Sequence, residues 1–88
     1  MLAGFGRGAP DGSAVDSAGY LWNCRYGGGC IVRVAPDGTI DRVVEMPCDN
    51  VTTCTFGGEG LGTLYVTTAR GGERQARLAG SLFALEAP

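Results

Sequence analysis

The chain has 88 residues and a mass of 9.0 kDa, which is small for a single domain, since domains usually contain roughly 100 to 150 residues. Hydrophobic residues make up 44% of it, and its 16 glycines show no three-residue period, so the composition excludes both a disordered chain and a collagen. Seven basic and nine acidic residues give a net charge of −2 without any histidine, and we therefore expect neither a nucleic-acid partner nor histidine-dependent catalysis.

The sequence shows no sign of a membrane or secretory segment. No apolar run approaches the ~20 residues that a helix needs to cross a bilayer. Residues 1–7 do not combine a charged start with an apolar stretch, as a secretory signal does. We therefore expect no membrane partner and a cytoplasmic, reducing setting in which the four cysteines remain thiols.

Short segments rich in β-branched and aromatic residues recur along the chain, separated by glycine-rich or Pro-Asp-Gly turns. Helical periodicity is nearly absent, except for a short helical turn predicted over 73–78. The pattern predicts an all-β fold with antiparallel sheets. The seven predicted strands cover residues 13–16, 20–25, 30–35, 40–46, 52–56, 63–69 and 81–86.

An internal repeat relates the two halves of the chain. Residues 19–22 align with 62–65, and after an insertion in the second copy, residues 29–34 align with 80–85. A unit of about 40 to 45 residues with four short strands is typical of a β-propeller blade. We predict two sheets of this four-stranded type, packed face to face, and the second unit shows only three clear strands. The first blade covers about 10–47 and the second about 50–87, together forming a partial propeller over 10–88, and segment 1–9 is unmatched.

Two blades cannot close a ring, because propellers contain roughly four to eight. The outer faces of the pair would leave apolar surface in water, which favours association. We therefore expect either a homo-oligomer whose copies complete the ring or a longer protein whose further blades lie upstream.

Seven motifs carry a family resemblance, and they span most of the chain, from residue 10 to residue 83. They are residues 10–16, 19–22, 26–29, 32–38, 52–58, 64–72 and 79–83. In order and spacing they resemble the C-terminal third of the SMP-30/gluconolactonase/regucalcin family. The resemblance implies two blades of a six-bladed propeller, a divalent cation (Ca²⁺, Mg²⁺, Mn²⁺ or Zn²⁺) in the central channel, and hydrolysis of sugar lactones or related esters.

Asp11 is the candidate catalytic and metal-binding residue. It lies in a Pro-Asp-Gly tripeptide, which by itself is typical of a turn whose Asp side chain accepts backbone hydrogen bonds. The same tripeptide at 36–38 is predicted to be a plain hairpin turn. The resemblance implies that Asp11 precedes an innermost strand and points into the channel, where it would bind the cation and act as general base for the attacking water. The family's other two metal ligands, a Glu and an Asn, would lie before Met1.

Three further residues are candidates for lining the channel. Tyr26 lies beside a triple glycine, whereas Thr53 and Cys54 follow the family's pattern for an inner strand. Core packing is the alternative for Thr53 and Cys54, because a small thiol is ordinary in a buried strand. We also predict that Trp22, Tyr65 and Phe83 pack between the blades.

The cysteines occur in two pairs, 24 with 30 and 48 with 54, each with five intervening residues. Zinc sites favour shorter spacings on turns, so structural zinc is not favoured. Cys24 and Cys30 are predicted to face each other across the hairpin at 27–29.

Two functions from different classes stay open. The first is part of a metal-dependent sugar-lactone hydrolase, which would bind a small-molecule lactone once its ring is complete. The alternative is a non-catalytic two-blade module that self-associates or binds a partner through its exposed sheet edges.

Overall fold

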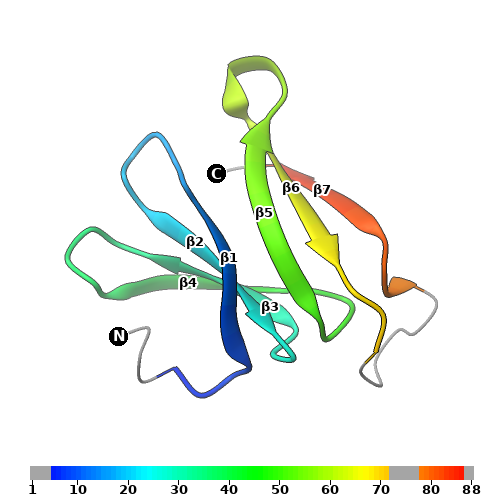
Figure 1. Ribbon diagram of the computed structural model, residues 1–88. Helices are drawn as coiled ribbons and strands as arrows, with labels where there is room; N and C mark the ends of the chain where they lie inside the picture. The colour runs from blue at the N-terminus through cyan, green and yellow to red at the C-terminus, as the bar shows by residue number, and fades with distance from the viewer. Residues whose placement is uncertain (1–4, 72–77, 87–88) are drawn as a thin grey trace.

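The computed structural model describes residues 5–71 and 78–86 and arranges them in two antiparallel sheets (Figure 1). Their strands follow one another in sequence order, and a 3-10 turn, η2 (Glu59–Leu61), connects β5 to β6. Sheet A contains β1 (Ala9–Val15), β2 (Leu21–Tyr26), β3 (Cys30–Val34) and β4 (Ile40–Glu45), and sheet B contains β5 (Val51–Gly57), β6 (Thr63–Thr68) and β7 (Leu82–Glu86).

The predicted all-β fold with antiparallel sheets is confirmed, and each predicted strand has its counterpart. Sheet B has three described strands, the number that the sequence clearly shows for the second unit. The largest difference in bounds is at β1, which begins at Ala9 rather than 13, because its pairing with β2 continues past the Pro-Asp-Gly tripeptide. The helical turn predicted over 73–78 lies almost entirely outside the described residues. Within these residues, no helix is long and apolar enough to cross a membrane.

The second Pro-Asp-Gly tripeptide forms the predicted hairpin turn, between β3 and β4. Gly38 adopts a φ of 90°, which a residue with a side chain rarely adopts. The Asp37 carboxylate accepts hydrogen bonds from the Thr39 N–H at 3.0 Å and from the Thr39 hydroxyl at 2.7 Å. These bonds lower the pKa of Asp37. The carboxylate therefore serves the turn itself.

The main core lies between the two sheets. Leu64 and Val66 alternate with more exposed residues along β6, so one face of sheet B packs against sheet A. Trp22 of β2 meets Phe56 of β5 edge to face, with ring centroids 6.0 Å apart, and Phe83 packs against the same core. The predicted packing of Trp22 and Phe83 between the blades is thus confirmed. The buried members are Trp22, Cys24, Ile31, Met46, Val51, Cys54, Leu64 and Val66.

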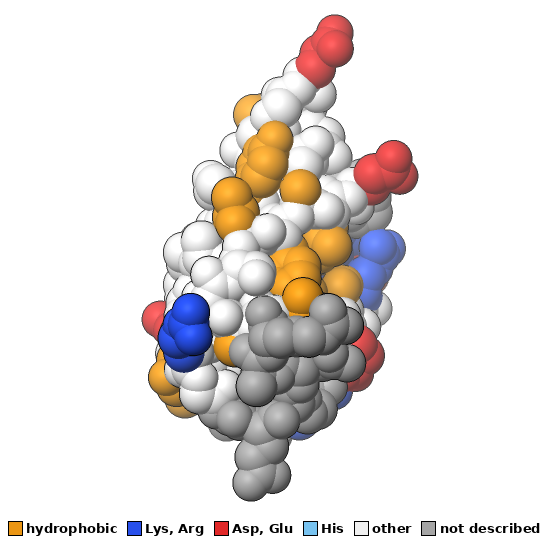
Figure 2. Space-filling view, turned by 90° about the vertical axis from the view of Figure 1, so that its right-hand side faces the viewer, with side chains coloured by type: hydrophobic (Ala, Val, Ile, Leu, Met, Phe, Trp, Pro, Cys, Tyr) orange, Lys and Arg blue, Asp and Glu red, His pale blue; other side chains and the backbone are white. Residues whose placement is uncertain are grey.

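Tyr65, which aligns with Trp22 in the repeat, lies on the opposite, outer face of sheet B. It pairs with Thr55 and Ala84, which are both exposed. Trp22 of sheet A faces sheet B, which is the next sheet along the chain. Tyr65 has the equivalent orientation in sheet B, because it lies on the face that points away from sheet A. Figure 2 shows this side of the molecule, where hydrophobic side chains are interspersed with polar ones; Leu82 in β7 is 65% exposed.

The expected contact between Cys24 and Cys30 is wrong. Cys24 pairs with Ile31, and Cys30 pairs with Arg25, so the two thiols lie on opposite faces of sheet A, because successive strand residues point to opposite sides. Cys24 belongs to the core between the sheets, whereas Cys30 packs with Val32 and Val34 in a smaller cluster.

Candidate metal site at the bulge of the innermost strand

Asp11 lies in a β-bulge of β1. Pro10 pairs with Arg25 and Ser13 pairs with Asn23, so Asp11 and Gly12 together oppose one residue of β2, Cys24. A bulge leaves one residue outside the regular ladder and turns its side chain in a new direction, which is why bulges are common beside active sites.

Gly12 allows β5 to approach this bulge closely. A β-carbon on Gly12 would lie 2.8 Å from the α-carbon of Thr53, and closer still to the Thr53 side chain. Real β-carbons do not approach other atoms this closely, so only glycine fits here without a backbone shift. The fold therefore brings Asp11 of β1 and Thr53 of β5 to neighbouring positions. Both residues were predicted from the sequence as channel candidates.

The Asp11 carboxylate is exposed and, in residues 5–71 and 78–86, receives no hydrogen bond and forms no ion pair. Other aspartates of sheet A are engaged. Asp16 accepts hydrogen bonds from Trp22 Nε1 at 2.9 Å and from the Arg33 guanidinium at 2.8 Å, and Asp41 pairs with Arg33 at 2.8 Å. The Asp11 carboxylate is thus open to a ligand from outside this part of the chain.

Burial and hydrogen bonding act in opposite directions on Asp16. Burial raises the pKa of its carboxyl, but the hydrogen bonds that it accepts outweigh burial, so the pKa falls from 3.8 to about 2. Asp16 is therefore a charged structural residue that links β1 to β2 and β3. Its hydrogen-bond donors are Trp22 Nε1, the Arg33 guanidinium and the backbone N–H groups of Ala18 and Tyr20.

Cys54 is buried in the core between the sheets and lies next to Cys24. Its Sγ is 3.6 Å from the Trp22 carbonyl oxygen. The pKa of Cys24 is raised, most of all by its hydrogen bond to Cys54, next by burial, and then by the negative charges of Cys54 and Asp11. Cys24 is therefore a neutral thiol beside Asp11. Cys54 has the core position that was the alternative to lining the channel.

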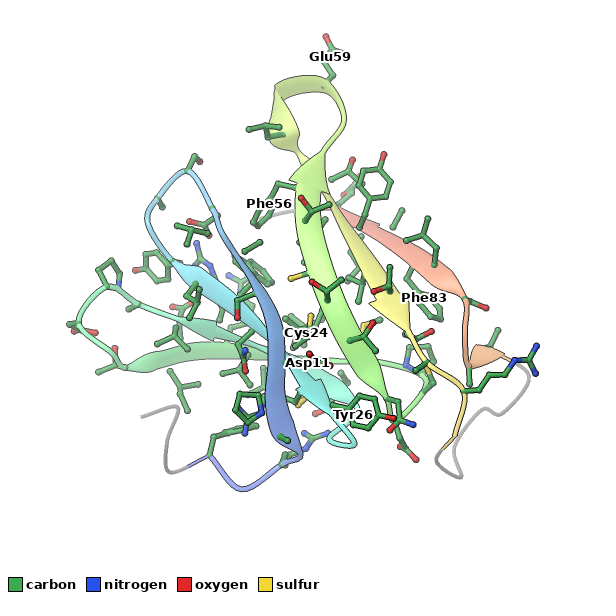
Figure 3. The ribbon with its side chains drawn as sticks, viewed as in Figure 1. Asp11, Cys24, Tyr26, Phe56, Glu59 and Phe83 are labelled. Carbon is green, nitrogen blue, oxygen red and sulfur yellow. The ribbon has the colours of Figure 1, made fainter. Side chains whose placement is uncertain are left out.

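Tyr26 ends β2 and is 43% exposed. It forms an isolated antiparallel bridge with Asn50, immediately before β5. In the view of Figure 3, Cys24, Asp11 and Tyr26 lie in that order between β1 and β5. Tyr26 thus lies at the same junction between the sheets as the other candidates.

Sequence reasoning did not identify two buried polar residues that lie behind the bulge. Asn23 is 3% exposed and Arg25 is 2% exposed. Asn23 Nδ2 donates to the Asp11 carbonyl oxygen at 3.2 Å and to Ser13 Oγ at 2.8 Å, and Arg25 donates to Asn23 Oδ1 at 3.0 Å. The signal that could have found them is the alternation of polar with apolar residues within 21–26, since polar groups inside a blade must find partners.

The described residues contain no group of three or more carboxylate or cysteine side chains placed to hold a metal ion. What they offer a cation is a single exposed carboxylate on the bulge of β1, and oxygen donors of this kind suit Ca²⁺, Mg²⁺ or Mn²⁺. Further ligands would have to come from elsewhere.

The fold and this junction define two successive blades of a β-propeller. The structure resembles a calcium-binding regucalcin from Agrobacterium tumefaciens with a TM-score of 0.78 and 32% identity, over 89% of this chain and 28% of that one. It also resembles a luciferin-regenerating enzyme, with a TM-score of 0.66 and 35% identity, over 68% of this chain and 20% of that one.

The chain belongs to the SMP-30/gluconolactonase/LRE-like family, whose model matches residues 1–70. It is 43% identical to pentonolactonase XacC of Haloferax volcanii over 90% of its length, 42% identical to a 6-deoxy-6-sulfogluconolactonase of Pseudomonas putida over 80%, and 42% identical to human regucalcin over 72%. It spans 30%, 25% and 21% of those proteins, respectively.

Proposed function

We propose that this chain forms part of a metal-dependent hydrolase of sugar lactones and that Asp11 binds the metal. The observation that carries the proposal is the Asp11 carboxylate, which stands on the bulge of β1, where β1 approaches β5, and receives no hydrogen bond from the described residues. Two lactonases among the relatives support the choice of substrate class.

A divalent cation fits this position by donor chemistry. The carboxylate oxygens of Asp11 are exposed, and they are hard ligands of the kind that such cations prefer. When bound, the cation would polarise the lactone carbonyl and stabilise the negative charge that develops on its oxygen. One structural relative is a calcium-binding regucalcin, which supports a divalent cation without fixing its identity for this chain.

Asp11 would also act as the general base. Water would add to the lactone carbonyl carbon while its proton passes to a carboxylate oxygen of Asp11. The bond from that carbon to the ring oxygen would then break, and Asp11 would return the proton to the departing ring oxygen, which gives the hydroxy acid and restores the carboxylate. Tyr26 and Thr53, on either side of the junction, would contact the sugar ring. This reaction needs neither a histidine nor a serine nucleophile.

The remaining ligands and blades would come from other copies of the chain or from a longer polypeptide. Three copies would supply six blades, the number that the family resemblance implies. We propose a cytoplasmic location for this assembly, because the sequence predicts four cysteines that remain thiols, which suits a reducing compartment.

Paramagnetic broadening by Mn²⁺ tests the proposal even at low affinity. We expect Mn²⁺ to broaden the amide signals of Asp11, Gly12 and Thr53 in the wild-type chain, and Asp11→Asn to abolish that effect. Asp37→Asn is the matched control, because Asp37 occupies the same tripeptide but its carboxylate is bound by Thr39. Equal broadening in the wild type and in Asp11→Asn would remove Asp11 from the site.

A non-catalytic, self-associating module is the second candidate. It is favoured by the outer face of sheet B, where Tyr65, Leu82 and Ala84 lie among threonines. An assembled chain that fails to hydrolyse aldonolactones in the presence of Ca²⁺, Mg²⁺, Mn²⁺ or Zn²⁺ would favour this module. Hydrolysis that is lost in Asp11→Asn would favour the lactonase.

A further inference from the structure

Arg25 is a buried cation without a carboxylate among its described partners. Its Nε donates to the Arg7 carbonyl oxygen at 3.0 Å, and Nη2 donates to those of Phe5 and Gly8 at 3.2 and 3.1 Å. The Phe5 ring lies 5.2 Å from the guanidinium carbon. These contacts fix the guanidinium between the segment that precedes β1 and the interior of sheet A.

The fixed guanidinium determines how the Asn23 amide is oriented. Because Arg25 Nη1 donates to Asn23 Oδ1 at 3.0 Å, the Nδ2 group must point toward β1. There its two N–H groups have two acceptors, the Asp11 carbonyl oxygen and Ser13 Oγ. One acceptor belongs to Asp11 in the bulge and the other to Ser13, which follows the bulge, so one amide spans Gly12.

The equivalent strand of sheet B lacks this arrangement. Asn23 pairs with Ser13 in β1, and the equivalent residue Val66 pairs with Cys54 in β5. Val66 is apolar and packs in the core. The amide is therefore not a general requirement for building a blade with a bulge.

We propose that Asn23 is a positioning residue for Asp11: oriented by Arg25, its amide clamps the bulge and holds the Asp11 carboxylate in its binding direction. This inference rests on the proposed function for its consequence, metal binding, but the rigidity of the bulge can be measured without a metal. Buried groups that orient a metal ligand affect affinity without touching the ion.

The test uses the ¹⁵N-labelled full chain and two variants. Asn23→Asp retains an acceptor for Arg25 but lacks both N–H donors, and Asn23→Leu removes the polar group without adding charge. Val66→Thr is the matched control, since it alters polarity at the equivalent buried position away from Asp11.

Two quantities are measured: the backbone order parameters of Asp11 and Gly12, and the Mn²⁺ concentration that half-broadens the Gly12 signal. Both Asn23 variants should lower the order parameters from about 0.85 to below about 0.6 and raise the Mn²⁺ midpoint by about tenfold or more. Val66→Thr should lower the melting temperature and leave both quantities unchanged.

Wild-type order parameters at Asp11 and Gly12 in both folded Asn23 variants would overturn the inference, as would an equal loss of order in Val66→Thr. If the wild-type chain shows no Mn²⁺ broadening at Gly12 but the Asn23 variants loosen the bulge, the clamp is supported and the proposed metal function fails. The two ideas can thus fail separately.

Discussion

Sheets A and B contain the same bulge at the same place in their first strands, β1 and β5, which are the innermost strands of the two blades, but the bulges carry different side chains. In β1 the bulge presents Asp11 and Gly12 opposite Cys24, and in β5 the register shifts between Val51 and Thr53. Thr52 lies within that shift, and its hydroxyl is 3.0 Å from the Thr67 carbonyl oxygen and 2.6 Å from the Thr67 hydroxyl. The second bulge therefore satisfies its own polar group, whereas the first leaves a carboxylate open. The bulge belongs to the blade, and its chemistry depends on the residue that it presents.

The residues at the ends of β2 and β6 show the same contrast. Arg25 and Thr68 occupy equivalent positions, opposite Pro10 and Val51. Arg25 holds three carbonyl groups of residues 5–8, whereas the Thr68 hydroxyl donates to the Ser81 carbonyl at 2.7 Å and accepts from the Gly80 N–H at 3.1 Å. Each anchors a neighbouring segment to its sheet, but Arg25 does so with a charge and more bonds.

The largest expected effect comes from removing the stronger of these two anchors. Arg25→Met should lower the free energy of unfolding by about 3 kcal/mol, because it leaves the buried Asn23 Oδ1 and three partly buried carbonyl oxygens without this donor. Thr68→Val, its counterpart in sheet B, should cost about 1 kcal/mol. Urea denaturation monitored by Trp22 fluorescence measures both. Equal losses would show that the two anchors are energetically alike.

The next effect concerns the close approach of the two innermost strands. Gly12→Ala should cost about 2 to 3 kcal/mol, because a β-carbon there would meet Thr53. Gly6→Ala is the control and should change stability by less than about 0.5 kcal/mol, since a β-carbon at Gly6 meets nothing within 4 Å. Adding Thr53→Gly to Gly12→Ala should restore part of the loss. Failure of this double variant to recover any stability would contradict the proposed steric cause.

The loops that follow the two innermost strands should differ in their response to pH. The depressed pKa of Asp16, about 2 against 3.8, means that its charge stabilises the fold by about 2 kcal/mol above pH 4 and that this stability is lost as the pH falls from 4 through 2. Asp16→Asn should remove this part of the acid dependence. Glu59→Gln, at the exposed tip of the loop in sheet B (Figure 3), should leave it unchanged. Unfolding curves measured between pH 6 and pH 2 test this prediction. An acid dependence that is lost in Glu59→Gln but kept in Asp16→Asn would contradict the role given to Asp16.

The smallest effect on stability is expected at the outer face of sheet B. Leu82→Ser should alter the free energy of unfolding by less than about 0.5 kcal/mol, because Leu82 is 65% exposed. If copies of the chain associate through this face, the same change should shift sedimentation toward the 9.0 kDa monomer. Thr39→Ser, in the β3–β4 turn away from that face, should shift nothing. Unchanged sedimentation in Leu82→Ser would place the association surface elsewhere.

Much of the fold could be predicted because its signals are local. Glycines and Pro-Asp-Gly tripeptides mark the turns, and the repeat of 19–22 in 62–65 identifies equivalent strands in two blades. Trp22 was correctly predicted to pack between the sheets for the same reason. The face of sheet A on which Cys30 lies was not predicted correctly. Strand pairing can shift by one residue without any change in composition, and such a shift moves a side chain to the other face.

The candidate site, like the fold, could be predicted from the sequence only where its signals are local. The sequence by itself determined the family, the blades and the choice of Asp11, because the motifs that carry them are contiguous. Only the tertiary structure decided how the two identical tripeptides are engaged. Thr39 binds the Asp37 carboxylate within its own turn, whereas β1 pairs on both sides of the tripeptide that contains Asp11 and turns it into a bulge. The clamp by Asn23 and Arg25 likewise depends on distant partners, since hydrogen bonds between β2, β1 and residues 5–8 exist only after the chain has brought those segments together.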